Sequence, residues 1–378
     1  MLTEAGCRER QRRLLELMRG QRWDAFLAAD YRTAYYFTGS LSPTETPVVF
    51  LLSRDSGSIL VTSAKTAAAA DRVVFLETYA IDRVLTHPWS DAARLLKEEL
   101  ASARGLSLRR VAAPLGTLPV LVKDALDCVA RNLEWSDATA GVLALRRCKS
   151  NDEVDEIRAA LRYCAVAYRA ARPVIEPGRT ELDVFSAMHA AVAREAGTTI
   201  SFPGDFACGT RAIRGGGPPT DRVIQPADLY ILDLFPAPAL YFGDTCRTFS
   251  ATPPTDLQLR AWGLVREALR LAEGMVKPGV RTREVYSAVK QFLDSHAITE
   301  DSFWHHLGHG IGHDGHEAPR IIPGSEEVFQ IGDVIALEPG IYTEALGGGI
   351  RLEDNYVVRE NGLDRLFDFP MELYPVWN

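Results

Sequence analysis

Apolar positions along the first third of the chain change from helical spacing to strand-like runs and back again. Leu14 and Met18 recur on one face among arginines and glutamates, which predicts an amphipathic helix. Two later apolar runs flank Asp55-Ser56-Gly57, a sequence typical of a hairpin turn. The pattern predicts a helix within residues 1–30, strands at 48–52 and 58–61, and helices near 91–102 and 119–132. Helices that alternate with short strands indicate a small α/β domain.

The pattern changes near residue 148, where we expect a domain boundary. Ser150 or Asn151 is suited to cap a new helix, because acidic residues follow in its first turn. Beyond it the sequence predicts helices at 151–172, 180–196, 256–276 and 282–296, and strands at 229–235, 240–249, 333–343 and 349–359. Two helices followed by strands, twice over, indicate an internally duplicated α+β domain.

Composition narrows the class of protein. A chain of 378 residues exceeds the length at which one hydrophobic core usually stops growing, which favours two domains. A formal charge of −8 argues against non-specific nucleic-acid binding. The sequence has no visible signal peptide, no membrane-spanning run and no C-x-x-C pair among its six cysteines. We therefore expect a cytoplasmic protein with reduced thiols and no membrane or nucleic-acid partner.

Asp233 and Asp244 are the first pair of candidate ligands. Asp233 lies within the apolar run 229–235, where a buried carboxylate needs a partner. A proline-rich stretch then predicts a turn before a second strand that contains Asp244. A hairpin symmetric about residues 238 and 239 would place the two carboxylates opposite each other. Like charges repel in that arrangement unless a cation lies between them.

The same construction recurs with two glutamates. Glu338 ends an apolar strand, and Glu353 lies at a nearly equal distance beyond the turn that joins the two strands. Any one of the four acids could be a salt-bridge or capping residue, but the repeated pattern argues against that interpretation. Four buried carboxylates without a cation would have to be protonated. Two divalent cations, with His309 as a fifth ligand, would balance them.

Five of the eight histidines gather in one glycine-rich segment. They are His305, His306, His309, His313 and His316. The glycines between them let the backbone approach a site closely. The alternative is a surface tract that binds metal adventitiously, but the ordered alternation of glycine and histidine argues against it.

Together these motifs resemble the creatinase/prolidase/Xaa-Pro aminopeptidase family of pita-bread metallohydrolases, peptidase family M24. The matching patterns are D-x10-D from 233, H-x-x-G-H-G-I-G-x-x-x-H-E-x-P from 305, E-P-G-I-Y from 338 and G-G-x-R-x-E-D from 348. Weaker matches lie at 30–39 and 145–150. The resemblance implies an α/β creatinase-like N-terminal domain over residues 1–148, followed by an α+β pita-bread metallopeptidase domain over 149–378.

The resemblance also implies a role for each candidate ligand. Asp233 would chelate one metal ion, while Asp244 and Glu353 would bridge both ions. His309 would complete the coordination of one ion, and Glu338 would complete that of the other. Four carboxylates and one imidazole form a hard ligand set, which favours Mn²⁺ or Co²⁺, with Zn²⁺ and Fe²⁺ as alternatives.

Four further residues match family positions around the metal ions. His305 and His316 would contact the substrate and stabilise the tetrahedral intermediate. Tyr342 and Arg351 would orient the ligands. By analogy Glu338 would also accept a proton from the attacking water and pass it to the leaving nitrogen. Each of these residues taken singly could be structural; their spacing from the ligands supports the functional interpretation.

The function implied by the resemblance is hydrolysis of Xaa-Pro peptide bonds in small peptides, by a dipeptidase or an aminopeptidase. One alternative keeps the metal ions but changes the substrate to a small non-peptide amide or a ring C–N bond. A second alternative is a pita-bread binding module without catalysis. The family's N-terminal domain commonly packs across a partner's active site, so we expect a homodimer. The segment Tyr31–Phe37 and Trp89 are candidates for its interface or for pocket walls, and the alternative is that both belong to the hydrophobic core.

Two positions depart from the family's pattern. Gly216 stands where the family usually carries a histidine that contacts the substrate, and Arg211, Arg214 or His313 could substitute for it. We expect Gly216→His to lower KM more than it changes kcat, as a uniform binding contact would. Cys246 stands where the family commonly has threonine, and we interpret it as a buried inert thiol rather than a ligand.

Overall fold

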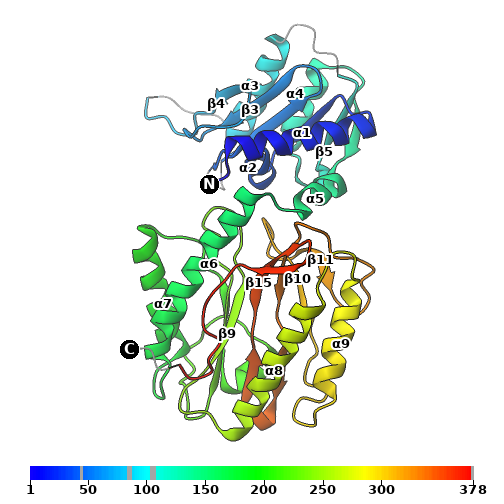
Figure 1. The fold of residues 1–378 in the computed structure, drawn as a ribbon. Coiled ribbons are helices and arrows are strands. Elements are labelled where there is room, and N and C mark those ends of the chain that lie inside the picture. The colour runs from blue at the N-terminus through cyan, green and yellow to red at the C-terminus, as the bar shows by residue number, and fades with distance from the viewer. Residues whose placement is uncertain (43–45, 83–86, 103–107, 376–378) are drawn as a thin grey trace. The chain divides into compact units, whose positions relative to one another are not determined.

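The computed structural model describes residues 1–42, 46–82, 87–102 and 108–375. It divides into two compact units, Met1–Arg146 and Arg147–Asn378 (Figure 1). Across the described ranges, none of the helices has the length and apolar character needed to cross a bilayer. None of the six cysteines, all of which lie in these ranges, forms a disulfide.

The N-terminal unit is a six-stranded sheet of order β4-β3-β2-β1-β5-β6 with helices packed on it. Its helices are α1 Glu4–Gln21, α2 Tyr31–Thr38, α3 Pro88–Ser102, α4 Val120–Val129 and α5 Thr139–Arg147. Its strands are β1 Ala25–Ala28, β2 Val49–Ser53, β3 Gly57–Thr62, β4 Arg72–Phe75, β5 Arg110–Ala113 and β6 Glu134–Asp137. The predicted hairpin is confirmed, because β2 and β3 pair antiparallel and close at Ser53 and Gly57.

The aromatic segment Tyr31–Phe37 forms α2 and belongs to the core of this unit. Tyr35, Tyr36 and Phe37 are fully buried, and Phe37 stacks on Phe50 with ring centroids 5.7 Å apart. Trp89 is partly buried against a second apolar cluster of the same unit. Of the two alternatives for this segment, the structure selects the hydrophobic core for the buried members of α2, because their rings pack inside the unit.

The C-terminal unit repeats the order of two helices followed by strands, as predicted. The first half contains α6 Asn151–Ala171, α7 Glu181–Ala196, β7 Gly204–Cys208, β8 Leu229–Leu234 and β9 Thr245–Ser250. The second half contains α8 Asp256–Met275, α9 Thr282–Asp294, β10 Gly308–Gly310, β11 Glu317–Ile321, β12 Val334–Leu337, β13 Gly340–Thr343, β14 Gly348–Arg351, β15 Asp354–Arg359 and β16 Gly362–Arg365. The sheets have the orders β7-β8-β9, β11-β10-β12-β15-β16 and β13-β14.

Helix α6 begins where the change of pattern predicted a new helix. Ser150 is the cap, and it forms a reciprocal capping box with Glu153. The Ser150 N–H donates to Glu153 at 2.9 Å, which satisfies a backbone donor that the helix cannot satisfy itself. Of the two candidates in the sequence, the structure therefore selects Ser150.

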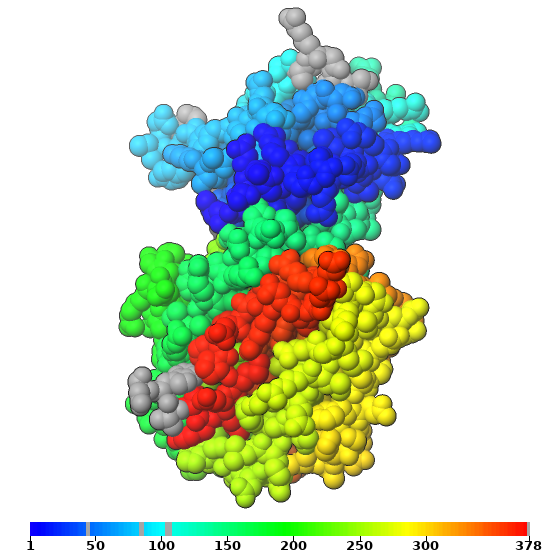
Figure 2. Space-filling model, viewed as in Figure 1, coloured from blue at the N-terminus to red at the C-terminus, as the bar shows by residue number. Residues whose placement is uncertain are grey.

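Helices α8 and α9 lie side by side against the sheet that carries β10, β12 and β15 (Figure 1). Val265, Val289 and Leu337 are among the fully buried members of this core. Burying a side chain of this size contributes about 1.5–3 kcal/mol. The chain after β16 passes between α6 and α8 on the face seen in Figure 2, and the Trp262 indole donates to the Met371 carbonyl at 3.0 Å.

The two halves of the C-terminal unit meet through backbone hydrogen bonds at the candidate ligands. Cys246 of β9 and Glu353, just before β15, exchange both of their backbone bonds. The Thr248 hydroxyl extends this junction, because it accepts from the Arg351 N–H at 2.9 Å. Residues far apart in the sequence are thus held in one rigid surface.

Candidate metal centre

The first carboxylate pair is placed differently from the predicted hairpin. Strands β8 and β9 pair Asp233 with Cys246, so Asp244 lies just before the ladder and is not opposite Asp233. The predicted partner of Asp233 is therefore wrong by two residues, because the connection does not close as a tight turn about residues 238 and 239. Asp244 and Cys246 still share a face, since side chains two apart on an extended chain point the same way.

Asn355 holds the backbone of Asp244, which lies just outside the β8–β9 ladder. The Asp244 N–H donates to the side-chain oxygen of Asn355 at 2.9 Å, and the Asn355 amide donates to the Asp244 carbonyl at 2.7 Å. Asn355 is fully buried. Asn355 has no role expected from the sequence, although it directly follows the two acids of the G-G-x-R-x-E-D pattern.

The two glutamates lie in a break between two ladders of identical register. Below the break β12 pairs with β15, ending at Leu337 and Asp354. Above it β13 pairs with β14, beginning at Gly340 and Arg351. Continuing the register across the break places Glu338 and Glu353 opposite each other. Their spacing from the turn in the sequence therefore corresponds to a real opposition.

His309 approaches the four acids from β10, a third segment of the chain. Its Nε2 lies 3.3 Å from Glu338 and 3.6 Å from Asp244. The potential ligand atoms of Asp244, His309 and Glu353 all lie within 4.8 Å of one another. Strand β10 brings His309 this close because Gly308 and Gly310 flank it, and a Cβ at either glycine would overlap a neighbouring backbone carbonyl.

The chemistry of this cluster fits a bound cation. Among the described residues, one buried oxygen each of Asp233, Glu338 and Glu353 has no hydrogen-bond donor. Burial raises the pKa of Asp233 to about 6, and burial together with neighbouring carboxylates raises the pKa of Asp244 and Glu353 well above the usual range. Orphaned acceptors and mutually repelling carboxylates are both satisfied by divalent cations.

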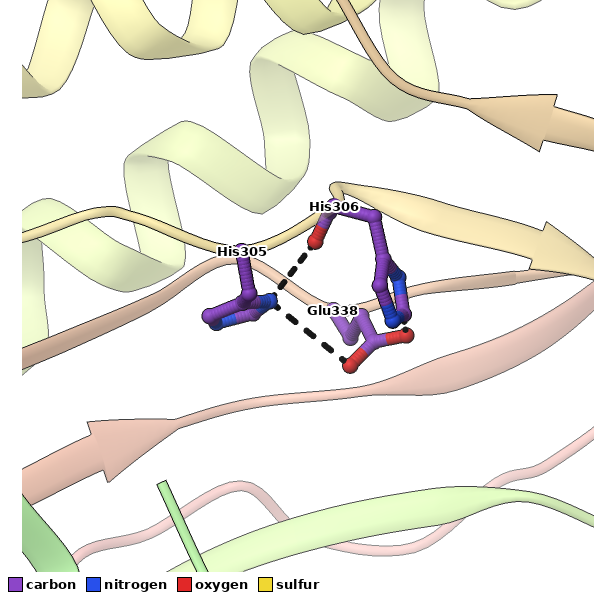
Figure 3. Close-up of side chains that lie close together, drawn as sticks. All are labelled: His305, His306 and Glu338. Atoms are coloured by element: carbon purple, nitrogen blue, oxygen red, sulfur yellow. Dashed lines mark hydrogen bonds and ion pairs between the residues drawn. The ribbon is translucent and has the colours of Figure 1, made fainter. Parts of the chain in front are cut away.

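His305 and His306 flank the carboxylate of Glu338, and each ring lies nearest a different carboxylate oxygen (Figure 3). The His306 Nδ1 lies 3.1 Å from Glu338, whereas His305 Nδ1 lies 4.0 Å away. Burial alone would raise the pKa of Glu338, but the nearby rings of His306 and His309 outweigh it and hold that pKa well below its usual range. His306 falls at an unassigned position of the H-x-x-G-H motif, and its place beside His305 in the histidine-rich segment is the signal that could have identified it.

His305 is engaged through both ring nitrogens. Its Nδ1 lies 2.7 Å from the His306 carbonyl oxygen, so this nitrogen carries the proton and donates. Its Nε2 lies 3.0 Å from the Tyr342 hydroxyl, which donates to it. Burial lowers the pKa of His305 to about 4, which favours the neutral ring that this arrangement requires.

His316 lines a cavity of 720 Å³ together with the candidate ligands. Its ring centroid lies 4.0 Å from that of His309. Burial lowers its pKa to about 4, and the nearby His309 contributes to that shift. For the described residues no hydrogen bond from this ring is recorded, so one ring N–H is available to a molecule in the cavity. The adjacent Glu317 forms a buried ion pair of 2.7 Å with Lys149, which anchors this wall.

Arg351 connects the ligands to the cavity wall. Its guanidinium lies 2.5 Å from Asp233 and donates to the Tyr342 hydroxyl at 3.0 Å and to the Gly215 carbonyl at 2.9 Å. A fixed fork of donors suits this position, because one side chain holds three acceptors in place. Hydrogen bonds therefore run from Asp233 through Arg351 and Tyr342 to His305.

The structure contradicts the expectation that Gly216→His would lower KM by adding a contact to the substrate. A Cβ at Gly216 would overlap the carboxyl group of Asp205 and lie 2.6 Å from its Cβ. Since Asp205 would have to move, Gly216→His would strain the site before it could contact a substrate. The space is filled by a carboxylate that our sequence argument did not consider.

Only one of the three candidate substitutes for the missing imidazole faces the cavity. His313 is buried elsewhere and donates to the Leu240 carbonyl at 2.9 Å. Arg211 is held by Glu181 and by the Pro218 carbonyl. Arg214 lines the cavity and is exposed. Cys246 is fully buried, and burial raises its pKa well above the usual range, which agrees with an inert thiol.

Comparison with known protein families supports the family suggested by the motifs. The model of metallopeptidase family M24 matches residues 155–360, more than half of the chain. The chain belongs to metallopeptidase family M24. The creatinase/prolidase N-terminal domain model matches residues 10–148 of this M24 chain. The family predicted from the motifs is thereby confirmed.

Two curated relatives of this M24 member are named Xaa-Pro dipeptidase. That of Pyrococcus horikoshii is 27% identical over 97% of this chain and 98% of its own length. That of Pyrococcus furiosus is 33% identical over 61% of this chain, a match that spans 65% of the enzyme.

Solved structures confirm the predicted fold, a creatinase-like α/β domain followed by an α+β pita-bread catalytic domain. The prolidase from Pyrococcus horikoshii OT3 superposes with a TM-score of 0.79 at 26% identity, over 97% of this chain and 99% of that one. X-Pro aminopeptidase from Thermotoga maritima has the same fold, with a TM-score of 0.79 at 23% identity over 97% of this chain and 99% of that one.

Proposed function

We propose that this M24 metallopeptidase hydrolyses Xaa-Pro peptide bonds in small peptides and uses two divalent metal ions. The observation that carries the proposal is the buried cluster of Asp233, Asp244, His309, Glu338 and Glu353 beside a cavity of 720 Å³. The names of the Pyrococcus relatives support the substrate class.

The five ligands divide between the ions in the proposal as the family resemblance implies. Asp244 and Glu353 would be shared by the two ions, and Asp233, His309 and Glu338 would supply the remaining ligands. Oxygen ligands predominate, so Mn²⁺ is the favoured ion, with Co²⁺, Zn²⁺ and Fe²⁺ as alternatives. When bound, such ions polarise a carbonyl oxygen and lower the pKa of a water molecule.

The remaining residues handle protons and charge. Glu338 accepts a proton during attack and returns it to the leaving nitrogen, and His306, 3.1 Å away, fixes the orientation of its carboxylate. His316 supplies an N–H to the developing oxyanion. His305 has no free N–H in its present tautomer, so in this proposal it contacts the substrate as part of the wall and holds Tyr342.

Two alternative functions would use the same cavity. A small non-peptide amide or ring would use the same metal ions. A binding module without catalysis would not need both His316 and Glu338 in the lining of the same cavity. We therefore place peptide hydrolysis first.

A substrate screen tests the proposal. We expect the purified protein, loaded in turn with Mn²⁺, Co²⁺ and Zn²⁺, to release proline or a proline peptide from Xaa-Pro dipeptides or from Xaa-Pro-Xaa tripeptides. Release from dipeptides alone identifies a dipeptidase, and release from tripeptides identifies an aminopeptidase. Metal content above about one tightly bound ion per chain, with no cleavage of either series, would favour a non-peptide amide as substrate.

We also propose that the protein is a cytoplasmic homodimer. Self-association through a two-fold axis is the commonest assembly of enzymes, and members of this family commonly use the N-terminal domain for it. Sedimentation at micromolar concentration checks the assembly, and a single species with the mass of one 41.7 kDa chain would contradict it.

A further inference from the structure

The wall of the cavity carries a carboxylate that the proposed metal centre does not use. Asp205 lies in β7 and lines the cavity. The register of β7 and β8 places it directly opposite Asp233. Directly opposed residues of antiparallel strands project to one face with Cβ atoms about 4.5–5.5 Å apart. The carboxyl group of Asp205 therefore lies at the edge of the metal centre, beside Asp233.

The Asp205 carboxylate is only weakly engaged by the protein. Its side chain is 36% exposed, whereas that of Asp233 is 10% exposed. For the described residues its recorded hydrogen bond is to Arg351, at 3.4 Å, and the same guanidinium nitrogen lies 2.5 Å from Asp233. Arg351 also donates to Tyr342 and Gly215, so its capacity is largely taken by other partners. Asp205 keeps acceptor sites directed to the cavity.

The neighbouring loop is shaped around this carboxylate. A Cβ at Gly216 would overlap the Asp205 carboxyl group, so glycine at this position leaves room for it. Arg214, the other charged residue on this part of the wall, forms no ion pair with Asp205 in the described ranges. An ionised carboxylate accepts hydrogen bonds and cannot donate them, so the group that it binds must be a donor, and a cation is bound most strongly.

We propose that Asp205 is a specificity-determining residue that binds a cationic group of the substrate residue preceding the scissile bond. This inference rests on the proposed function, since it assumes that the scissile carbonyl lies at the metal centre. The first residue of the substrate then lies beside Asp233, within reach of the carboxylate opposite. The cation is either the α-ammonium group of that residue or a basic side chain.

Three amino-acid amides distinguish these two sources without any need for turnover. Lysinamide carries both cations, norleucinamide carries only the α-ammonium group, and N-acetyl-lysinamide carries only the side-chain ammonium. Their Kd values are measured by calorimetry on the metal-loaded protein and on its Asp205→Asn variant. Asparagine keeps the shape of the side chain and an oxygen for Arg351, so the variant removes little but the charge. Asp221→Asn is the matched control, because Asp221 is exposed and does not line the cavity.

We expect Asp205→Asn to weaken binding of lysinamide about five- to tenfold, as for one charge-assisted hydrogen bond at a partly exposed site. A parallel loss with norleucinamide assigns the α-ammonium group. A parallel loss with N-acetyl-lysinamide assigns the basic side chain. In turnover of Lys-Pro the same variant should raise KM and leave kcat within about twofold, as for a contact equal in ground and transition states.

Three results would overturn the assignment of Asp205. In the first, the wild-type protein binds none of the amides at millimolar concentration. In the second, the three Kd values of the Asp205→Asn variant equal those of the wild type. In the third, the variant loses the same factor in affinity for all three amides. The last would show that Asp205 acts through Arg351 or the metal centre. Failure of the wild type to cleave any Xaa-Pro peptide would instead reject the proposed function, while the amide binding still tests Asp205.

Discussion

Alanine at Asp244 or Glu353 is expected to abolish hydrolysis and to reduce the content of bound metal. Each carboxylate is proposed to bridge both ions, so its loss removes a ligand from each. Metal ions contribute several kcal/mol of transition-state stabilisation, so kcat/KM should fall at least about a thousandfold. Activity assays combined with elemental analysis of the dialysed proteins check this expectation.

Thermal unfolding gives a second, independent measurement on the same variants. Metal at about 100 times its Kd should stabilise the wild type by about 2.7 kcal/mol, and this gain should shrink in either variant. Glu195→Ala is a matched control, because Glu195 is exposed on α7, outside the cavity lining. Normal turnover with undiminished metal in the Asp244 or Glu353 variant would reject their assignment as bridging ligands.

Replacement of Arg351 by methionine is expected to lower kcat by about 10- to 100-fold, the usual cost of losing a residue that orients metal ligands. Arg351 is buried and holds Asp233 at 2.5 Å while it donates to Tyr342. Methionine retains much of the apolar bulk but cannot hold either partner. Steady-state kinetics at saturating Mn²⁺ measures the loss.

Two controls separate this orienting role from general damage. Tyr342→Phe removes only the hydroxyl between Arg351 and His305, so its effect on kcat should be smaller and in the same direction. Arg162→Met removes an exposed positive charge that lies outside the cavity, and it should leave kcat unchanged. If Arg351→Met folds and turns over within about twofold of wild type, Arg351 does not orient the ligands.

The local elements of the C-terminal unit could be predicted because their signals are local. The four helices of that unit were placed to within a residue or two, since helical spacing of apolar residues and capping groups act over a few positions. Glu338 and Glu353 were correctly paired because both ladders that flank them share one register.

The Asp233 hairpin shows where such reasoning fails. Symmetry about a presumed turn put Asp244 opposite Asp233, but the strand begins only at Thr245. The position of Asp244 is set instead by Asn355, which is 111 residues away in the sequence. A contact between residues so far apart in the sequence produces no periodic pattern from which it could be predicted.

The sequence by itself determined the family, the order of helices and strands, and the residue types that gather at the candidate metal centre, because each is carried by short motifs at set spacings. Only the tertiary structure decided what surrounds them. It brought His306 to Glu338, excluded His313 from the cavity and placed Asp205 in front of Gly216. These outcomes depend on which strands pair and which side chains compete for one volume, and close packing settles that competition only when the whole unit is folded.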